Sequence, residues 1–249
     1  MPRGAEGIVQ ALKGAGVDTI FGIPSIHNIG LYDVLRREPS IRHIVCRHEA
    51  AATHMADGYA RAGARLGVIV SSTGPGAGFT LSSLQEAWGS CSPVLMITTD
   101  IEAAKIGQGL GALHELEEQG SLFRTVTKAT FCVRPGDDFQ ATTKQAIDLA
   151  LGGRPGPVCI QAPHDLLAGE VATTSTPADA PAPTVPPLPT RIDEAVALLR
   201  RARQPVIILG TAAARADLAN DLTAIADAAC APVIVSTAAK GVVAEDHPL

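Results

Sequence analysis

The chain has 249 residues, of which 46% are hydrophobic and 18% are charged. This is enough apolar material for a substantial core, and the length is near the point where one core gives way to two. The net charge of −5 and the lack of a basic run with interleaved aromatic residues exclude nucleic acid as an expected partner. No apolar stretch has the length of a signal peptide or a bilayer span, so the sequence predicts a cytoplasmic protein without a membrane partner.

Short apolar runs rich in β-branched residues recur in the first 165 residues. They are TIFGI, HIVC, GVIVSS, PVLMIT and PVCIQ, and segments with helical spacing such as HNIGLYDVLRR lie between most of them. This alternation predicts an α/β fold, a doubly wound parallel sheet with helices on both faces. Ligands of such sheets bind beyond the carboxyl ends of the strands, so the loops GIPS, RHEA, SSTGPGAG and TTDIEAAKIGQG are the candidate site.

Residues 171–190 contain six prolines and no apolar period, which is typical of an extended connector. We therefore expect a first domain over residues 1–168, a proline-rich linker over 169–189 and a second unit over 190–249. In the second unit RIDEAVALLRRARQ and ADLANDLTAIADAA have helical spacing, and PVIILG and APVIVST have the composition of strands. This order predicts the first half of a Rossmann-like α/β domain that is cut in mid-fold.

Five cysteines are spread along the chain without a CxxC pair or a cluster of histidines. They offer neither the ligand spacing of a zinc site nor a disulfide framework, and the sequence assigns no metal ligand. Four of the five lie in apolar stretches, which predicts small buried thiols.

The glycine-rich segment GPGAG, residues 74–78, follows a predicted strand. It lacks the lysine of a phosphate-binding P-loop, and Pro75 and Phe79 break the GxGxxG spacing. A tight strand-to-helix turn without a ligand is an equally good interpretation.

Glu49 stands at the start of a helix of small residues in RHEAAATHMADGYARAG, residues 47–63. An acidic residue in the first turn of a helix complements the helix dipole and needs no further role. The neighbouring residues are small and apolar, however, so we also expect the carboxyl to be partly desolvated. A carboxyl held neutral can donate a hydrogen bond, which a solvated glutamate does not do.

Eight segments follow one another in the order FGIPS, RHEAAATHMADGYARAG, SSTGPGAG, ALHELEEQ, VTKA, GRPGPVCIQAPHD, PVIILG and HPL. Together they resemble the amino-terminal part of the thiamine-diphosphate-dependent 2-oxo acid decarboxylases and carboligases, the acetolactate synthase group. In that family the first domain binds the aminopyrimidine of the cofactor, the middle domain is a doubly wound spacer, and a third domain binds diphosphate and magnesium. The resemblance implies a pyrimidine-binding domain over 1–168 and a partial middle domain over 190–249.

The resemblance also implies roles for individual residues. Glu49 matches the glutamate that exchanges a proton with the pyrimidine nitrogen and so activates the cofactor. The other cofactor-binding positions that the resemblance implies are Ile23, Pro24, Gly74, Pro75, Gly76 and Phe79.

Three positions depart from the acetolactate synthase pattern, and two of them are assigned to the substrate. His114 replaces a glutamine and can donate to a substrate carboxylate or move a proton, although a loop histidine bonded to backbone is an equally good interpretation. Ser25 replaces a glycine, and Phe79 replaces an asparagine. These departures leave the 2-oxo acid open, and the segment ILGTAAA does not support a flavin site.

The function implied is the pyrimidine-binding part of a thiamine-diphosphate-dependent lyase or transferase, as a fragment or a split component. It decarboxylates a small 2-oxo acid and releases the aldehyde or ligates it to a second carbonyl. Thiamine diphosphate and Mg²⁺ need a further domain or partner chain that carries the diphosphate site, so we expect a homo- or hetero-oligomer. The alternative is a non-catalytic binding or regulatory paralogue that kept the fold.

Overall fold

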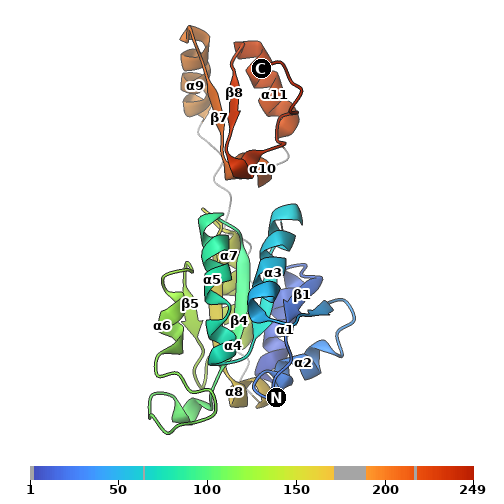
Figure 1. Cartoon of the computed structure of the whole chain (residues 1–249), viewed down its shortest axis with the longest axis vertical. Coiled ribbons are helices and arrows are strands. Elements are labelled where there is room, and N and C mark those ends of the chain that lie inside the picture. The colour runs from blue at the N-terminus through green and yellow to red at the C-terminus, as the bar shows by residue number, and fades with distance from the viewer. Residues whose placement is uncertain (1–2, 64, 171–188, 216–217) are drawn as a thin grey trace. The chain divides into compact units, whose positions relative to one another are not determined.

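A computed structural model describes residues 3–63, 65–170, 189–215 and 218–249 of the chain. The chain divides into two compact units, Met1–Ala182 and Pro183–Leu249 (Figure 1). Most of the linker predicted at 169–189 lies outside the described residues, and the domain boundaries stay a prediction. Across the described ranges, no helix combines the length and the apolar character needed to cross a membrane.

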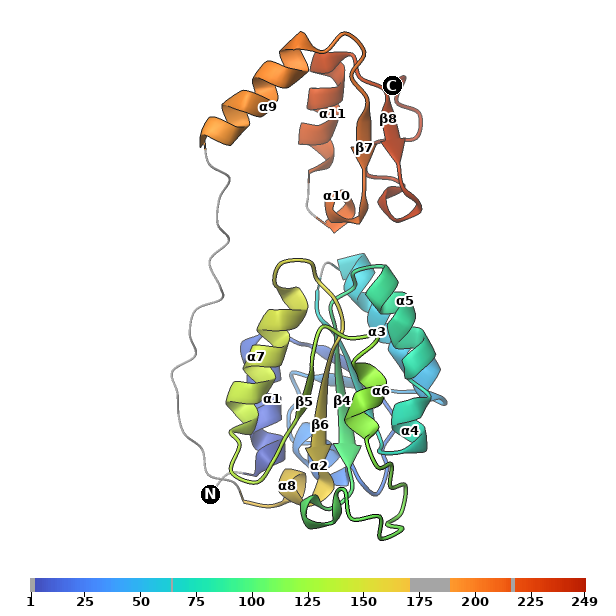
Figure 2. The same cartoon turned by 90° about the vertical axis from the view of Figure 1, so that its left-hand side faces the viewer.

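The first unit is built on a six-stranded sheet with the strand order β2-β1-β3-β4-β6-β5. Every strand pairing is parallel, so all the strands end at the same edge (Figure 2). The predicted doubly wound parallel sheet is confirmed. The strands are β1 (Thr19–Gly22), β2 (Arg42–Val45), β3 (Gly67–Ser71), β4 (Val94–Asp100), β5 (Thr130–Cys132) and β6 (Val158–Pro163).

Strand β5 is the one strand of this sheet that the sequence did not predict. It has three residues and lies at the sheet edge, where its side chains are partly or fully exposed. A short edge strand lacks the continuous apolar run that marks a strand buried on both faces.

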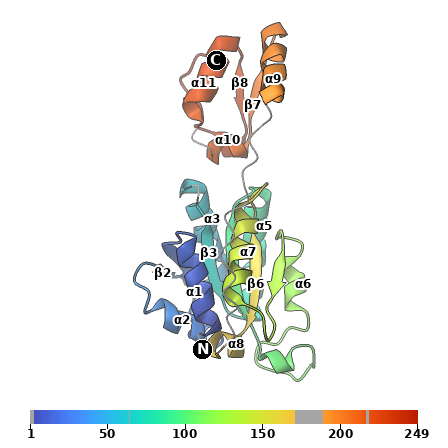
Figure 3. The same cartoon turned by 180° about the vertical axis from the view of Figure 1, so that it is seen from behind.

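Helices cover both faces of the sheet. Helices α1 and α7 pack together on one face, and α3 and α5 pack together on the other (Figures 1 and 3). The helices are α1 (Gly4–Gly14), α2 (Ile29–Leu35), α3 (Glu49–Gly63), α4 (Pro75–Gly78), α5 (Leu81–Gly89), α6 (Gln119–Phe123), α7 (Phe139–Leu151) and α8 (His164–Ala168), with a 3₁₀ turn, η1, at Ala103–Lys105.

The small residues of α3 have a packing role. Ala52, Ala56 and Ala60 recur every four residues and are buried against the sheet. A Cβ atom added to Gly67 of β3 would lie 2.1 Å from the carbonyl oxygen of Ala56. The helix therefore lies directly against the backbone of β3.

The cysteines are less buried than the sequence predicted. Cys46 and Cys159 are buried, Cys91 is partly exposed, and Cys132 and Cys230 are exposed. The prediction of four buried thiols is wrong because Cys132 lies on the edge strand β5 and Cys230 ends a helix.

The second unit has the predicted helix-strand-helix-strand order. Its two strands pair in parallel, and Leu209, Ala239 and Val243 form its core. The elements are α9 (Pro189–Arg201), β7 (Ile207–Leu209), α10 (Thr211–Arg215), α11 (Ala219–Ala229), β8 (Val233–Val235) and a 3₁₀ turn, η2, at Thr237–Ala239.

Candidate functional site

The loop after β3 is the centre of the candidate site. We call residues 72–76 the GPG loop. Gly74 has φ +58° and ψ −116°, a backbone conformation that residues with a side chain rarely adopt. A Cβ atom added to Gly74 would also lie 2.4 Å from the carbonyl oxygen of His114. Both the conformation and the contact with His114 therefore require glycine at this position.

Glu49 lies beside the other end of the GPG loop. It is the first residue of α3, as predicted, and its side chain is half-buried. A Cβ atom added to Gly76 would lie 3.3 Å from Glu49 Oε1. The carboxyl thus lies directly against the backbone at Gly76, where a side chain would crowd it.

Ser25 connects the loop after β1 to the GPG loop. Its hydroxyl donates a hydrogen bond to Ser72 Oγ at 2.9 Å, and its backbone N–H donates to Asn28 Oδ1 at 2.6 Å. Asn28 Nδ2 in turn donates to the Ile23 carbonyl at 3.0 Å. Ile23 packs against the core under α3, and Pro24 is exposed.

His114 is exposed and has a positive φ of +64°. The turn that carries it is closed by two hydrogen bonds, from Glu115 N to the Ala112 carbonyl at 2.9 Å and from Ala112 N to Glu115 Oε2 at 2.8 Å. The segment that follows His114 is not helical, because α6 begins only at Gln119.

Two further imidazoles lie near His114. The His27 ring centroid is 5.4 Å from that of His114 and 5.5 Å from that of His164. His27 is 7% exposed, and its Nδ1 atom has no hydrogen-bond partner. Burial, followed by the nearby His164 and His114 rings, lowers the pKa of His27.

Phe79 ends α4 and is 53% exposed. Its ring centroid is 4.9 Å from that of His48, the residue before Glu49. Of the predicted site residues in other segments, Ser25, Glu49 and His114 thus contact the GPG loop, whereas the Phe79 ring packs near that of His48.

Sequence reasoning missed Gln119, which is 1% exposed and forms hydrogen bonds through both the oxygen and the nitrogen of its side-chain amide. Its Oε1 accepts hydrogen bonds from Thr73 Oγ1 at 2.9 Å and from Gly74 N at 2.6 Å. Its Nε2 donates to the Thr99 carbonyl at 2.8 Å. Nothing in the polar run HELEEQ marks its last residue as buried.

Sequence reasoning also missed Asp100, the last residue of β4, which is 2% exposed. Its carboxylate accepts from Ile101 N at 2.7 Å and from Gln161 Nε2. Burial raises the pKa of Asp100, and the charge of Glu115 adds to this effect.

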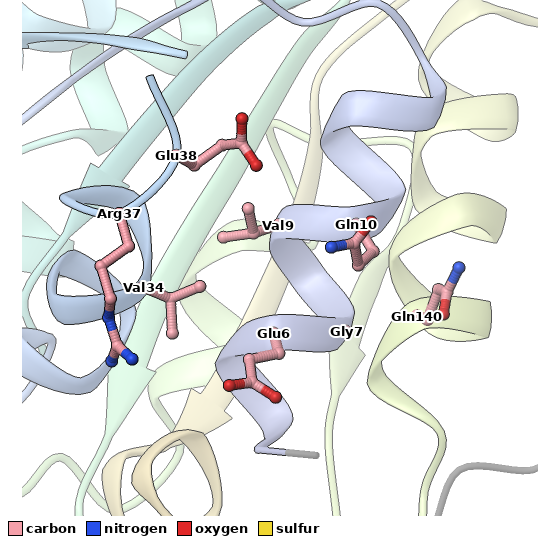
Figure 4. A pocket seen from close by; sticks show the side chains of 8 residues that line it. All are labelled: Glu6, Gly7, Val9, Gln10, Val34, Arg37, Glu38 and Gln140. Carbon is pink, nitrogen blue, oxygen red and sulfur yellow. The ribbon is translucent and has the colours of Figure 1, made fainter. Parts of the chain in front are cut away.

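Two cavities of similar size are lined by different segments of the chain, and one of them contains His114. One of about 380 Å³ lies against α1 (Figure 4) and is lined by Glu6, Gly7, Val9, Gln10, Val34, Arg37, Glu38 and Gln140, none of which is a predicted site residue. The other, of about 410 Å³, is lined by Gly109, Gly111, Ala112, His114, Glu115 and Glu117. Among the side chains that the structure describes, no group of three or more His, Cys, Asp or Glu is arranged to hold a metal ion.

Two family descriptions match the chain. Residues 2–122 match "Thiamine pyrophosphate enzyme, N-terminal TPP binding domain", and residues 192–249 match "Thiamine pyrophosphate enzyme, central domain".

Relatives match nearly the whole chain. It is 35% identical to the "Probable acetolactate synthase large subunit" of Methanocaldococcus jannaschii over 99% of its length and 42% of the relative's. It is 33% identical to the acetolactate synthase of Mycobacterium bovis, over 98% of its length and 40% of the relative's. It is 34% identical to a "Probable 2-ketoarginine decarboxylase" of Pseudomonas aeruginosa, over 98% and 43%. The chain spans about two fifths of the length of these relatives, and it belongs to the thiamine pyrophosphate enzyme family, among proteins similar to acetolactate synthase.

Proposed function

We propose that this chain is the pyrimidine-binding part of a thiamine-diphosphate-dependent enzyme that decarboxylates a 2-oxo acid. The product aldehyde is released or ligated to a second carbonyl. The observation that carries this proposal is the position of Glu49 Oε1, 3.3 Å from where Gly76 would carry a Cβ. Because Gly76 has no side chain, the loop backbone lies directly against this carboxyl at the ligand-binding edge of a parallel sheet, which is where a flat ring in contact with the carboxyl would bind.

The described residues fit the aminopyrimidine end of the cofactor. Glu49 would hold the ring nitrogen and exchange a proton with it, while the GPG loop, Ile23 and Pro24 would supply the shape of the ring site. The chemistry that the bound cofactor supplies is an electron sink for the carbon that loses carbon dioxide.

The diphosphate and Mg²⁺ are assigned to another domain or partner chain. The two matched segments are the N-terminal TPP binding domain and the central domain, and the family resemblance implies a third domain for the diphosphate and Mg²⁺. This division supports a homo- or hetero-oligomer as the active form. The cytoplasmic location expected from the sequence stays a prediction.

His114 and Ser25 are assigned to the substrate. His114 is exposed at the cavity of about 410 Å³, and its backbone lies against Gly74. An imidazole there can donate to the carboxylate of a 2-oxo acid or move a proton during its decarboxylation. The Ser25 hydroxyl lies at the first residue of the GPG loop, where it is bonded to Ser72.

A 2-oxo acid with a distal positive charge is a second candidate substrate. Glu115 and Glu117 line the same cavity as His114, and two carboxylates beside an imidazole favour a ligand with a cation at its far end. One relative bears the name of a 2-ketoarginine decarboxylase. Comparing cationic, straight and branched 2-oxo acids as substrates distinguishes this candidate from a pyruvate-type substrate.

The test is the assembled enzyme with Glu49→Gln. Glutamine keeps the size of the side chain but cannot exchange a proton with the pyrimidine nitrogen, so release of carbon dioxide should fall by orders of magnitude while cofactor binding changes little. Glu86→Gln is the control, because Glu86 is 60% exposed on α5 and pairs with Arg61. Wild-type turnover by Glu49→Gln contradicts the role of Glu49, and an inactive wild-type assembly favours the non-catalytic paralogue.

A further inference from the structure

We propose that Gln119 is a positioning residue that holds the GPG loop in the shape that Glu49 and His114 require. We call the hydrogen bonds of the Gln119 side chain the clamp. Its effect on catalysis rests on the proposed function, whereas its effect on the structure of the GPG loop does not. Gln119 begins α6, five residues after His114, and reaches from that segment to the loop after β3.

The amide of Gln119 has three partners on two strand ends. Its oxygen accepts from Thr73 Oγ1 at 2.9 Å and from Gly74 N at 2.6 Å, and its nitrogen donates to the Thr99 carbonyl at 2.8 Å. All of these bonds are buried. The side chain therefore ties the loop after β3 to the end of β4 inside the protein, where lost bonds are not replaced by water.

The start of α6 is closely packed, so the backbone of Gln119 is held in place. A Cβ atom added to Gly120 would lie 2.8 Å from Cys132 Sγ and 3.1 Å from Gln161 Oε1. The helix thus approaches β5 and β6 more closely than a side chain at residue 120 would allow.

The clamp acts on Gly74, whose backbone is constrained in two ways. Gly74 has φ +58°, and its α-carbon contacts the backbone of His114. Two residues later Gly76 contacts the Glu49 carboxyl. A hydrogen bond that fixes Gly74 N therefore also fixes the surfaces against which His114 and Glu49 rest.

Glutamine suits this position because its side-chain amide carries an acceptor and a donor at the same distance from the backbone. Glutamate keeps the acceptor for Thr73 and Gly74 but presents a second oxygen to the Thr99 carbonyl. Methionine has similar length and makes none of the three bonds. The two variants thus separate loss of one bond from loss of all three.

The test is amide hydrogen exchange measured by NMR on the full chain. In Gln119→Met the Gly74 amide should exchange at least about tenfold faster, because a buried hydrogen bond is lost. Amides of α1 and α7 should change only by the global loss of stability. The control is Thr143→Val, which removes a buried side-chain hydrogen bond to the Phe139 carbonyl within α7, away from the loop.

The outcomes decide the proposal without reference to catalysis. Faster exchange confined to residues 72–78 in Gln119→Met supports the clamp, and loop exchange no faster than in Thr143→Val overturns it. If Gln119→Met does not fold, Gln119→Ala, which also removes all three bonds, is compared with the same control by the same criterion. In the assembled enzyme, a fall in kcat larger than the change in substrate KM is the expected consequence. A wild-type assembly that is inactive on 2-oxo acids contradicts the proposed function but does not affect the conclusion from hydrogen exchange.

Discussion

The carboxyl of Glu49 rests against the α-carbon of Gly76, with Oε1 3.3 Å from the place a Cβ would take. The contact joins the start of α3, which follows β2, to the loop after β3. In the sheet β1 lies between these two strands. The parallel order therefore brings together two loops that are separated by more than twenty residues in the chain.

Gly76→Ala should reduce activity far more than stability. The new Cβ would lie 3.0 Å from Ser72 Cβ and 3.3 Å from Glu49 Oε1, so the carboxyl is pushed from its place while the backbone tolerates alanine. We expect a loss of at least about tenfold in kcat/KM in the assembled enzyme, since small displacements of catalytic groups are costly. The loss of unfolding free energy should be about 1 kcal/mol.

The control for this change is Gly78→Ala in the same short helix. A Cβ atom there meets nothing within 4 Å. Alanine should leave activity unchanged and stabilise the chain by about 0.4–1 kcal/mol, because it reduces the entropy of the unfolded state. Equal activity losses in the two variants would show that α4 as a whole, and not the contact with Glu49, matters.

His114→Ala tests the substrate role. If His114 donates to the substrate carboxylate, alanine removes a charge-assisted hydrogen bond worth about 1.5–3 kcal/mol, which is a loss of roughly ten- to a hundredfold in kcat/KM. Glutamine should restore part of the activity because it keeps a donor. Leu113→Ala is the control in the same loop, since Leu113 is 61% exposed.

The substrate panel separates the two interpretations of His114. Unequal losses across straight, branched and cationic 2-oxo acids indicate contact with the substrate. A uniform, near-wild-type profile together with a small loss of thermal stability indicates that His114 is a structural loop residue.

The pKa of His27 predicts a pH dependence of stability. Because burial lowers this pKa in the folded chain, the unfolded chain binds more protons as the pH falls below about 6.5. The free energy of unfolding should therefore decrease between pH 7 and pH 5.5. In His27→Gln this decrease should be smaller, and urea denaturation at several pH values measures it. Parallel curves for the two proteins would contradict the prediction.

The regular parts of the fold follow from local patterns in the sequence. The strands β1, β3, β4 and β6 are marked by β-branched apolar runs, because both faces of a central parallel strand are buried. The start of α3 at Glu49 was likewise predictable from the small residues that follow it.

The polar contacts of the site do not follow from such patterns. Hydrophobic periodicity reports which apolar side chains are buried, but Gln119 is buried by bonds to Thr73, Gly74 and Thr99 from distant segments. His27 is buried in a loop beside His114, where no period applies. Only the folded arrangement of the strand ends brings these residues together.

Gly74→Ala should destabilise the chain through two effects. Alanine is strained at φ +58° and ψ −116°, at a cost of about 1–3 kcal/mol, and its Cβ would meet the His114 carbonyl oxygen at 2.4 Å. Gly109→Ala is the control for a positive φ, because Gly109 has φ +62° and a Cβ there meets nothing within 4 Å. Urea denaturation should show a clearly larger loss of unfolding free energy for Gly74→Ala. The excess over the Gly109 variant measures the combined effect of ψ −116° and of the contact between the GPG loop and the turn that carries His114. Losses of equal size would mean that strain alone makes glycine necessary at residue 74, and that the turn of His114 is free to move away from the loop.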